Sequence, residues 1–183
     1  PDERDFMSLP YQPTDYAARL DGLDAKRLRI GVLIDMGTGL PPHPSVVAAC
    51  EAAARALEAS GAVVEPMRSF LTPEMLEGFN VFFEARSFND IAAMPQAVRS
   101  KLLPFIVEWC SWRAGSFSGA EVMTAYTRLM AMREAAVRAT ARFDYLLSPT
   151  SPILPYEAES ACPGNDPRDA LPHIAFTVAW NMS

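Results

Sequence analysis

Hydrophobic and polar positions follow one another along the chain in blocks that predict strands and helices in turn. Residues 28–35, Leu-Arg-Ile-Gly-Val-Leu-Ile-Asp, form a short apolar run that is typical of a strand buried on both faces of a sheet. A helix is predicted for residues 44–60, because apolar side chains recur there at spacings of three and four: Val47, Cys50, Ala54 and Leu57. Gly61 ends this helix, and residues 62–66 resume a strand, which predicts a βαβ unit.

The middle of the chain is predicted to be helical. A first helix begins at Thr72, which Pro73 and Glu74 follow, and it continues to about residue 94. A second is predicted for residues 96–113, with a kink at Pro104. A third runs from Ser118, with Glu121 placed for a capping box, to about residue 142. Its predicted inward side chains are Val122, Tyr126, Leu129, Met130 and Val137.

The last part of the chain combines one strand with a long irregular stretch. Residues 143–147 predict the strand, and the stretch from Ser148 to Ala175 is rich in proline. Strands that alternate with helices indicate an α/β fold. We expect a single α/β region over residues 1–183, divided into a connector (1–27), a strand–helix–strand unit (28–67), a helical layer (72–142), and a strand with a proline-rich loop (143–183).

Composition and charge exclude several kinds of partner. The formal net charge is −6 and the basic residues are scattered, so no cationic stripe is available for nucleic acid or an anionic membrane surface. Charged residues interrupt every apolar stretch well before the roughly twenty residues that span a bilayer, and the acidic N-terminus is unlike a signal peptide. Cys50, Cys110 and Cys162 show no CxxC spacing, which predicts no disulfide framework and favours a cytoplasmic location.

Most motifs that carry chemistry are absent from the sequence. His43 and His173 each lie beside a proline without a nucleophile motif nearby, so neither is predicted to act as a catalytic base. The Gly37-Thr38-Gly39 run lacks the third glycine of a dinucleotide fingerprint and predicts a plain turn. Asp2, Glu3 and Asp5 are interpreted as solvated, and no spacing of metal ligands occurs. The sequence therefore predicts no metal and no cofactor.

One segment combines a strand end with rigid, hydroxyl-bearing residues: Ser148-Pro149-Thr150-Ser151-Pro152 follows the strand of residues 143–147. Ligands of α/β proteins usually bind at the carboxyl ends of strands, and two prolines hold Thr150 and Ser151 in place. From the residues alone, a strand terminator is the simpler interpretation, because the segment supplies no base or charge.

A resemblance to a known family changes that interpretation. The run from Asp144 to Pro152 resembles the Asp-x-Leu-Leu-x-Pro-Thr-x-Pro pattern of the amidase signature family. Other stretches that are similar to the family occur in the same order along nearly the whole chain: Pro1, Asp2, Asp5 and Ser8; Leu28 to Val32; the helix of residues 46–61 leading into Ala62-Val63-Val64-Glu65; and Phe176-Thr177 followed by Asn181.

The resemblance implies a fragment of an amidase, with a partial α/β/α sandwich in which helices cover a mixed sheet. Members of the family hydrolyse amide bonds with a serine nucleophile, a second serine that follows a cis peptide bond, and a lysine. These residues belong to an earlier segment that this chain lacks, and Lys26 and Lys101 lie in different surroundings. We therefore expect no catalytic residue here and no activity from this chain by itself.

What remains for the chain is substrate binding. Pro149, Thr150, Ser151 and Pro152 are expected to line the site of a small-molecule amide substrate. Most aromatic residues of the helical layer are expected to pack in the core, with the wall of a pocket as the alternative: Phe82, Phe83, Trp109 and Trp112. Two other functions stay open: a non-catalytic domain that binds small molecules, and an interaction fragment that forms a homo-oligomer through an exposed sheet edge.

Overall fold

Three short parallel strands join the early and late parts of the chain. The computed structural model describes residues 4, 8, 10–18 and 24–182. Strands β1 (Arg29–Val32), β2 (Val63–Pro66) and β3 (Tyr145–Leu147) form a sheet in the order β2-β1-β3. In this register Ile30 lies opposite both Val64 and Tyr145. The predicted α/β fold is confirmed, and each strand of this part of the sheet runs parallel to β1.

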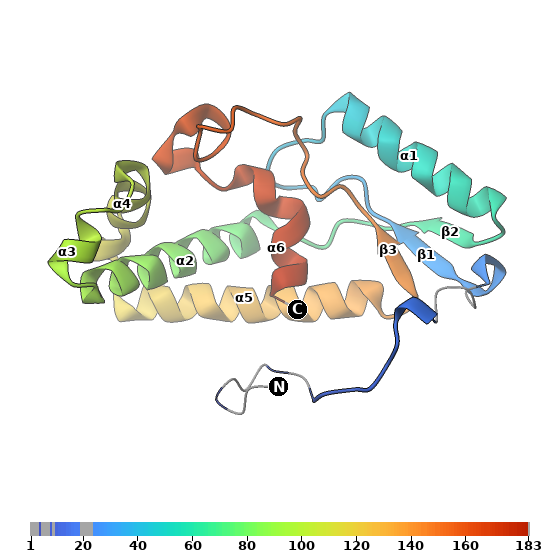
Figure 1. Cartoon of the computed structure of the whole chain (residues 1–183), viewed down its shortest axis with the longest axis horizontal. Coiled ribbons are helices and arrows are strands. Elements are labelled where there is room, and N and C mark those ends of the chain that lie inside the picture. Colours follow the sequence, from blue (N-terminus) through green and yellow to red (C-terminus); the bar gives the residue numbers. More distant parts are fainter. Residues whose placement is uncertain (1–3, 5–7, 9, 19–23, 183) are drawn as a thin grey trace.

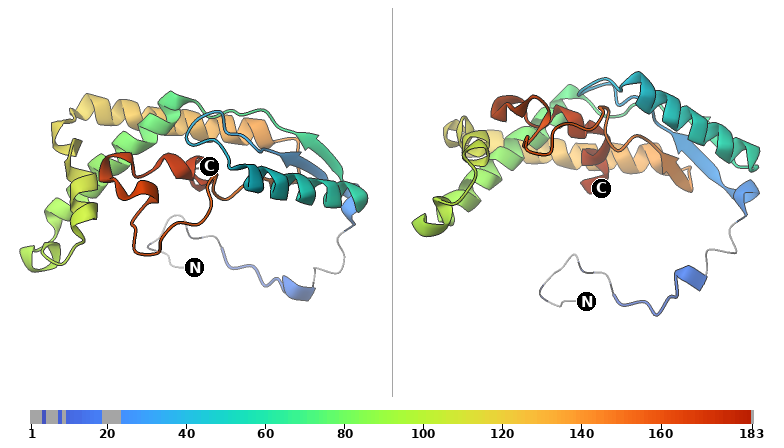
Figure 2. Two further views of the ribbon diagram at one scale, coloured as in Figure 1. Left: turned by 90° about the horizontal axis from the view of Figure 1, so that it is seen from above. Right: turned by 45° about the horizontal axis from the view of Figure 1, so that its top comes forward.

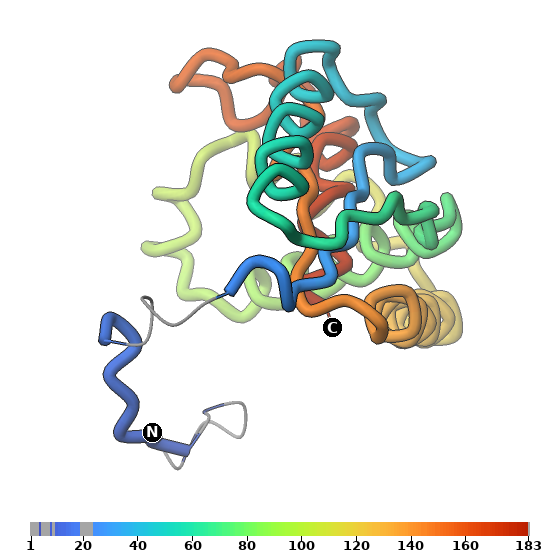
Figure 3. The backbone as a smooth tube through the Cα atoms, turned by 90° about the vertical axis from the view of Figure 1, so that its right-hand side faces the viewer, coloured from blue at the N-terminus to red at the C-terminus, as the bar shows by residue number. Residues whose placement is uncertain are grey.

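The helices lie on both sides of this sheet. Figures 1 and 3 show α1 on one side of the strands and α2 and α5 on the other, and Figure 2 shows the same layering from above. The helix bounds are α1 Pro44–Ala59, α2 Pro73–Ala93, α3 Gln96–Arg99, α4 Pro104–Ser111, α5 Gly119–Thr140 and α6 Ala175–Asn181. Short 3-10 helices occupy η2 Ala25–Arg27, η3 Ala114–Ser116, η4 Pro163–Asn165, η5 Pro167–Asp169 and η6 Pro172–Ile174.

The strand–helix–strand unit forms as its apolar pattern predicts. Cys50 is buried on the inner face of α1, where a small thiol packs like an aliphatic side chain. Gly61 follows the end of α1 with a φ of 101°, a left-handed conformation that favours glycine. The chain can therefore turn directly from α1 into β2, which pairs with β1 in parallel.

The main hydrophobic core lies where α2, α5 and α6 meet the end of β1. Leu33 and Met36, which follow β1, are fully buried beside Phe176 and Val178 of α6. The two long helices approach each other closely at Gly78 of α2: a Cβ atom there would lie 2.6 Å from Arg128 Cβ and 3.1 Å from the Ala125 carbonyl oxygen of α5. Glycine and alanine thus set the distance between α2 and α5.

The face of α5 that packs inward differs from the predicted one. The helix begins as expected, because Ser118 and Glu121 form the capping box. Leu129 is buried as predicted, whereas Tyr126, Met130 and Val137 are exposed. The buried positions are Ala125, Leu129, Met132 and Ala136. Both faces of α5 carry apolar residues, and the small alanines occupy the inward positions because they allow α2 to come close.

The helix predicted for residues 96–113 is wrong as a single element. Residues 100–103 interrupt it, so that α3 and α4 are separate and Pro104 is the first residue of α4 rather than a kink. Leu103 has an extended conformation with a ψ of 132°, which is the conformation that a following proline favours. The proline ring therefore starts a new helix with a new direction (Figure 1).

Part of the N-terminal connector is described. Asp2, Glu3 and Asp5, interpreted above as solvated, lie outside the described residues, as do Pro1 and residues 19–23. Within the described part, Tyr11 and Tyr16 are largely exposed. Across the residues that the structure describes, every helix is too short or too polar to cross a bilayer.

Candidate functional site

The segment from Pro149 to Pro152 lies at the carboxyl edge of the sheet, directly after β3. The last sheet hydrogen bond there runs from Leu33 N to Leu147 O, at 2.9 Å. Pro149 and Pro152 are buried, Ser151 is half-buried and Thr150 is exposed. The prolines thus fix the backbone, and the Thr150 side chain is left accessible to a ligand.

Two other segments contact this edge of the sheet. His43 N donates a hydrogen bond to Pro152 O at 2.6 Å, and Leu40 N donates one to Pro172 O at 3.3 Å. Gly39 permits the second contact: its φ is 77°, and a Cβ atom there would lie 2.8 Å from Pro172 O. The loop after β1, the segment after β3 and the start of η6 are therefore fastened together by backbone atoms.

Asp144 shows that part of the family-like run is structural. Its Oδ2 accepts a hydrogen bond from Arg29 N at 2.7 Å, and its own backbone N–H donates to Arg29 O at 2.8 Å. These bonds extend the pairing of β3 with β1 at the amino edge of the sheet, opposite the edge where Pro149 to Pro152 lie. The carboxylate thus sets the register of β3 and is too far along the strand to touch a ligand at the other edge.

The two histidines have structural surroundings. His43 caps α1, with Nδ1 accepting a hydrogen bond from Ser45 N at 3.2 Å. His173 lies in η6 with its ring against Tyr156, and burial lowers its pKa below the usual range. Among the hydrogen bonds of the described residues, neither ring meets a serine or cysteine side chain. Neither residue is arranged as the base of a nucleophile.

The thiols and carboxylates offer no reactive or metal-binding cluster in the described part of the chain. All three cysteines are free and buried, and burial raises the pKa of the thiols of Cys50, Cys110 and Cys162. A raised pKa keeps a thiol protonated and therefore unreactive. No group of three or more histidine, cysteine, aspartate or glutamate side chains is gathered as metal ligands in residues 24–182 or the other described positions.

A cavity of about 210 Å³ lies between α2, α4 and residues 167–172. Trp109 and Trp112 line it, whereas core packing was expected for most of the four candidate aromatics. Phe82 and Phe83 instead pack in the core, with ring centroids 5.7 Å from Tyr126 and 4.3 Å from Phe79, respectively. Pro172 belongs both to the cavity wall and to the contact with Leu40, so the cavity is linked to the loop after β1, whose His43 contacts Pro152 in turn.

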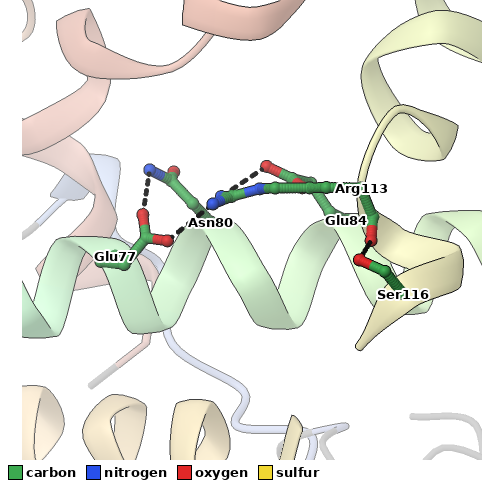
Figure 4. Close-up of polar contacts among 5 residues, drawn as sticks. All are labelled: Glu77, Asn80, Glu84, Arg113 and Ser116. Atoms are coloured by element: carbon green, nitrogen blue, oxygen red, sulfur yellow. Dashed lines mark hydrogen bonds and ion pairs between the residues drawn. The ribbon is translucent and has the colours of Figure 1, made fainter. Parts of the chain in front are cut away.

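A paired charge cluster forms one wall of the cavity (Figure 4). Arg113 donates to both oxygens of Glu84, with Nε–Oε2 at 2.6 Å and Nη2–Oε1 at 2.9 Å, and its Nη1 lies 2.8 Å from Glu77 Oε1. Glu84 is only 4% exposed. These hydrogen bonds, that of Glu84 above all, raise the pKa of Arg113 above its usual range. The guanidinium is thus permanently charged and held in one orientation.

Sequence reasoning missed this cluster. Glu77 and Glu84 are seven residues apart, two helical turns, and therefore share a face of α2 with Asn80. Glu84 also lies between apolar residues of the helix, where a carboxylate needs a partner. Those two signals in the sequence indicate a buried ion pair, although they do not identify Arg113, which is 29 residues further along the chain.

Comparison with known proteins gives a family and several structures of similar fold. The Amidase family profile matches residues 1–183. A bacterial aryl acylamidase of the amidase signature enzymes family matches with a TM-score of 0.77 and 20% identity, over 100% of this chain and 40% of that chain. The 6-aminohexanoate cyclic dimer hydrolase in complex with substrate matches with a TM-score of 0.72 and 24% identity, over 100% of this chain and 41% of that chain.

The same cyclic dimer hydrolase in another structure matches with a TM-score of 0.64 and 25% identity, again over 100% of this chain and 41% of that chain. None of the curated proteins matches significantly. This chain therefore spans about 40% of the length of the solved structures that it resembles. Because the family profile covers all of its residues, the chain belongs to the Amidase family.

Proposed function

We propose that this chain is part of an amidase, which hydrolyses a carboxylic amide to a carboxylate and an amine or ammonia. The observation that carries the proposal is the family match over residues 1–183. The position of Pro149 to Pro152 supports it, because that segment lies at the carboxyl edge of a parallel sheet, where ligands of α/β proteins bind. The substrate is a small-molecule amide, and no cofactor is part of the proposal.

In this proposal Pro149, Thr150, Ser151 and Pro152 form a wall of the substrate site. The buried prolines hold the wall rigid, and Thr150 presents a hydroxyl group that can donate to or accept from the substrate. A wall fixed in this way contributes by orienting the amide and by excluding water from it. It supplies no charge or base, so it takes no part in bond breaking.

The proposed mechanism is the Ser-Ser-Lys route with catalytic residues outside these 183 residues. A serine oxygen attacks the amide carbonyl, the amine leaves with a proton delivered through the second serine and lysine, and water then hydrolyses the acyl-enzyme. Neither lysine of this chain lies at the carboxyl edge of the sheet, where the proton transfer is proposed to occur. The Lys26 side chain lies against Gly61 at the amino edge of the sheet, and Lys101 is exposed between α3 and α4.

We also propose a cytoplasmic location and assembly into a homo-oligomer. A cytoplasmic location is supported by three free, buried cysteines. A homo-oligomer is supported by the exposed side chains of Val63 on β2 and Tyr145 on β3, the two outer strands of the described sheet.

An alternative is a domain that binds a small molecule without chemistry. The cavity beside Trp109, with its buried ion pair, favours it, because such a cavity needs no catalytic residue to bind a ligand. Under this alternative the 183-residue chain binds a ligand saturably, and no longer form of the protein hydrolyses amides.

The test compares the complete encoded protein with the 183-residue chain on a panel of aryl and aliphatic amides. Release of amine is followed by a fluorogenic amine reagent, and release of carboxylate by mass spectrometry. We expect turnover by the complete protein and none by the 183-residue chain. Turnover by the 183-residue chain would refute the location of the catalytic residues, and inactivity of both across the panel would favour the binding domain.

A further inference from the structure

The cavity lined by α2 and residues 167–172 presents an unused hydrogen-bond acceptor. Asn80 Oδ1 is buried and has no hydrogen-bond partner among the described residues. The amide nitrogen of Asn80 lies 3.5 Å from Glu77 Oε2. This neighbour fixes the orientation of the amide, because the reverse orientation would place its oxygen against a carboxylate. Asn80 therefore contributes a free acceptor to the cavity wall that it forms.

Glu77 contributes a second acceptor beside it. Its Oε1 accepts from Arg113 Nη1 at 2.8 Å, whereas among the described residues its Oε2 has only the long contact with Asn80. A carboxylate oxygen can accept two hydrogen bonds, so Glu77 Oε2 is able to take another donor. Figure 4 shows Glu77, Asn80 and the Arg113 guanidinium side by side above α2. Two acceptors with spare capacity thus lie on consecutive turns of one helix.

The charge of the cavity selects between cationic and anionic ligands. Three carboxylates and two guanidinium groups line it, so the wall carries a net negative charge. Both guanidinium charges already have carboxylate partners: Arg113 is paired with Glu84 and Glu77, and Arg168 Nη2 lies 3.6 Å from Glu108 Oε1. An incoming anion would meet these carboxylates, while an N–H donor with positive charge would satisfy the acceptors and be attracted.

We propose that this cavity binds a protonated primary amine, whose ammonium group donates to Asn80 Oδ1 and Glu77 Oε2. The hydrocarbon part of the ligand then lies against Trp109 and Leu171, which also line the cavity. At about 210 Å³ the cavity is below the common range of ligand pockets, so it takes one end of a ligand. This inference rests on the proposed function where it identifies the substrate class: amides that carry a primary amino group.

Binding is measured without turnover, by NMR of the indole N–H groups in the complete protein labelled with ¹⁵N-tryptophan. Trp→Phe variants assign the signals of Trp109, Trp112 and Trp180. The probes are benzylammonium, benzyl alcohol and benzoate, which have similar shape and differ in charge. We expect benzylammonium to shift the Trp109 and Trp112 signals saturably. The Trp180 signal stays in place, because that ring packs on Phe70 away from the cavity.

Two variants and a control complete the test. Glu77→Gln and Asn80→Ala each weaken benzylammonium binding by about tenfold, the effect of one charge-assisted hydrogen bond. Glu51→Gln, which changes the same charge on the exposed face of α1, leaves it unchanged. The proposal is overturned by equal binding of benzoate or benzyl alcohol, by absence of shifts with benzylammonium, or by unchanged binding in both variants.

Kinetic measurements test the proposed substrate class separately from the amidase activity itself. In the complete protein, an amide with an amino group is hydrolysed with a higher kcat/KM than its alcohol counterpart, and Glu77→Gln abolishes that preference of about tenfold. Equal values for both substrates in the unmodified protein contradict the substrate class. Absence of turnover with NMR binding intact contradicts the proposed function and leaves the amine site in place.

Discussion

The segment from Pro149 to Pro152 and the cavity between α2, α4 and residues 167–172 are held by different forces. Pro149 to Pro152 are fixed by proline rings and by the backbone hydrogen bond from His43 N, without any ionised group. The neighbouring cavity is fixed by a buried carboxylate, Glu84, and its guanidinium partner, Arg113. The first region therefore tolerates side-chain changes and is sensitive to backbone strain. The second depends on keeping two opposite charges together.

The largest effect is expected from Arg113→Ala. The substitution leaves Glu84 buried without its partner, and we expect a loss of about 3–5 kcal/mol in the free energy of unfolding. Denaturation in urea, followed by circular dichroism, measures it. Arg138→Ala, which breaks an exposed pair with Glu134, is the matched control and changes stability by no more than about 0.5 kcal/mol.

A double replacement sharpens that prediction. Replacing the pair by apolar side chains, Glu84→Met with Arg113→Leu, restores most of the lost stability, because no buried charge remains. A loss of less than about 1 kcal/mol in Arg113→Ala would show that Glu84 reaches solvent, and the two regions would then not differ as described.

A smaller effect is expected where the backbone holds the site. In Gly39→Ala the new Cβ meets Pro172 O at 2.8 Å, and the residue keeps a φ of 77° that favours glycine. We expect a loss of about 2–3 kcal/mol, measured in the same urea titration. Gly119→Ala is the control, since a Cβ there meets nothing within 4 Å. Equal stability of both variants would mean that the contact between Leu40 and Pro172 does not hold the two loops together.

The pH dependence of stability probes His173, which follows Pro172 of the cavity wall. Burial lowers its pKa below the usual value of about 6.5, so the unfolded chain binds a proton that the folded chain resists. Stability from this group is complete above pH 6.5 and is lost as the pH falls through the lowered pKa. His173→Phe keeps a ring against Tyr156 and removes this loss. The melting temperatures of the unmodified protein and of His173→Phe are compared between pH 7.5 and pH 5.5. The same pH dependence in both proteins would contradict a buried neutral imidazole.

The smallest effect on stability is expected in the segment proposed to contact substrate. Thr150 is exposed, and the Ser151 hydroxyl accepts a long hydrogen bond of 3.5 Å from Ile153 N. Thr150→Val and Ser151→Ala therefore change stability by about 0.5 kcal/mol or less. In the complete protein we expect Thr150→Val to raise KM severalfold with kcat less affected. Unchanged kinetics in both variants would remove this segment from the substrate site.

The sequence predicts best those elements whose pattern is made by residues close together in the chain. The strand at β1, the helix α1 and the capping box of Ser118 depend on residues close together in the chain, and all three are confirmed. The inward face of α5 depends on which residues α2 presents to it, and apolar side chains occur on both faces, so that prediction was wrong for Tyr126, Met130 and Val137.

The candidate site likewise has one part made of contiguous residues and another made by contacts between residues far apart in the chain. The Pro149 to Pro152 segment was found because its residues are contiguous, and its role toward substrate stays a prediction. The cavity was not found, because Arg113 reaches Glu84 and Glu77 across 29 and 36 residues of sequence. The spacing of Glu77, Asn80 and Glu84 on α2 signals a shared polar face, yet only the fold identifies what lies opposite it.

We propose that this chain contributes substrate-binding residues and that the nucleophile lies elsewhere. Covalent labelling tests it most directly: the complete protein is treated with a fluorophosphonate, which reacts with activated serines, and the labelled peptide is identified by mass spectrometry. We expect one labelled serine outside residues 1–183, and no label on Ser151 or any other serine of this chain. A label within residues 1–183 that accompanies loss of amide hydrolysis would contradict it.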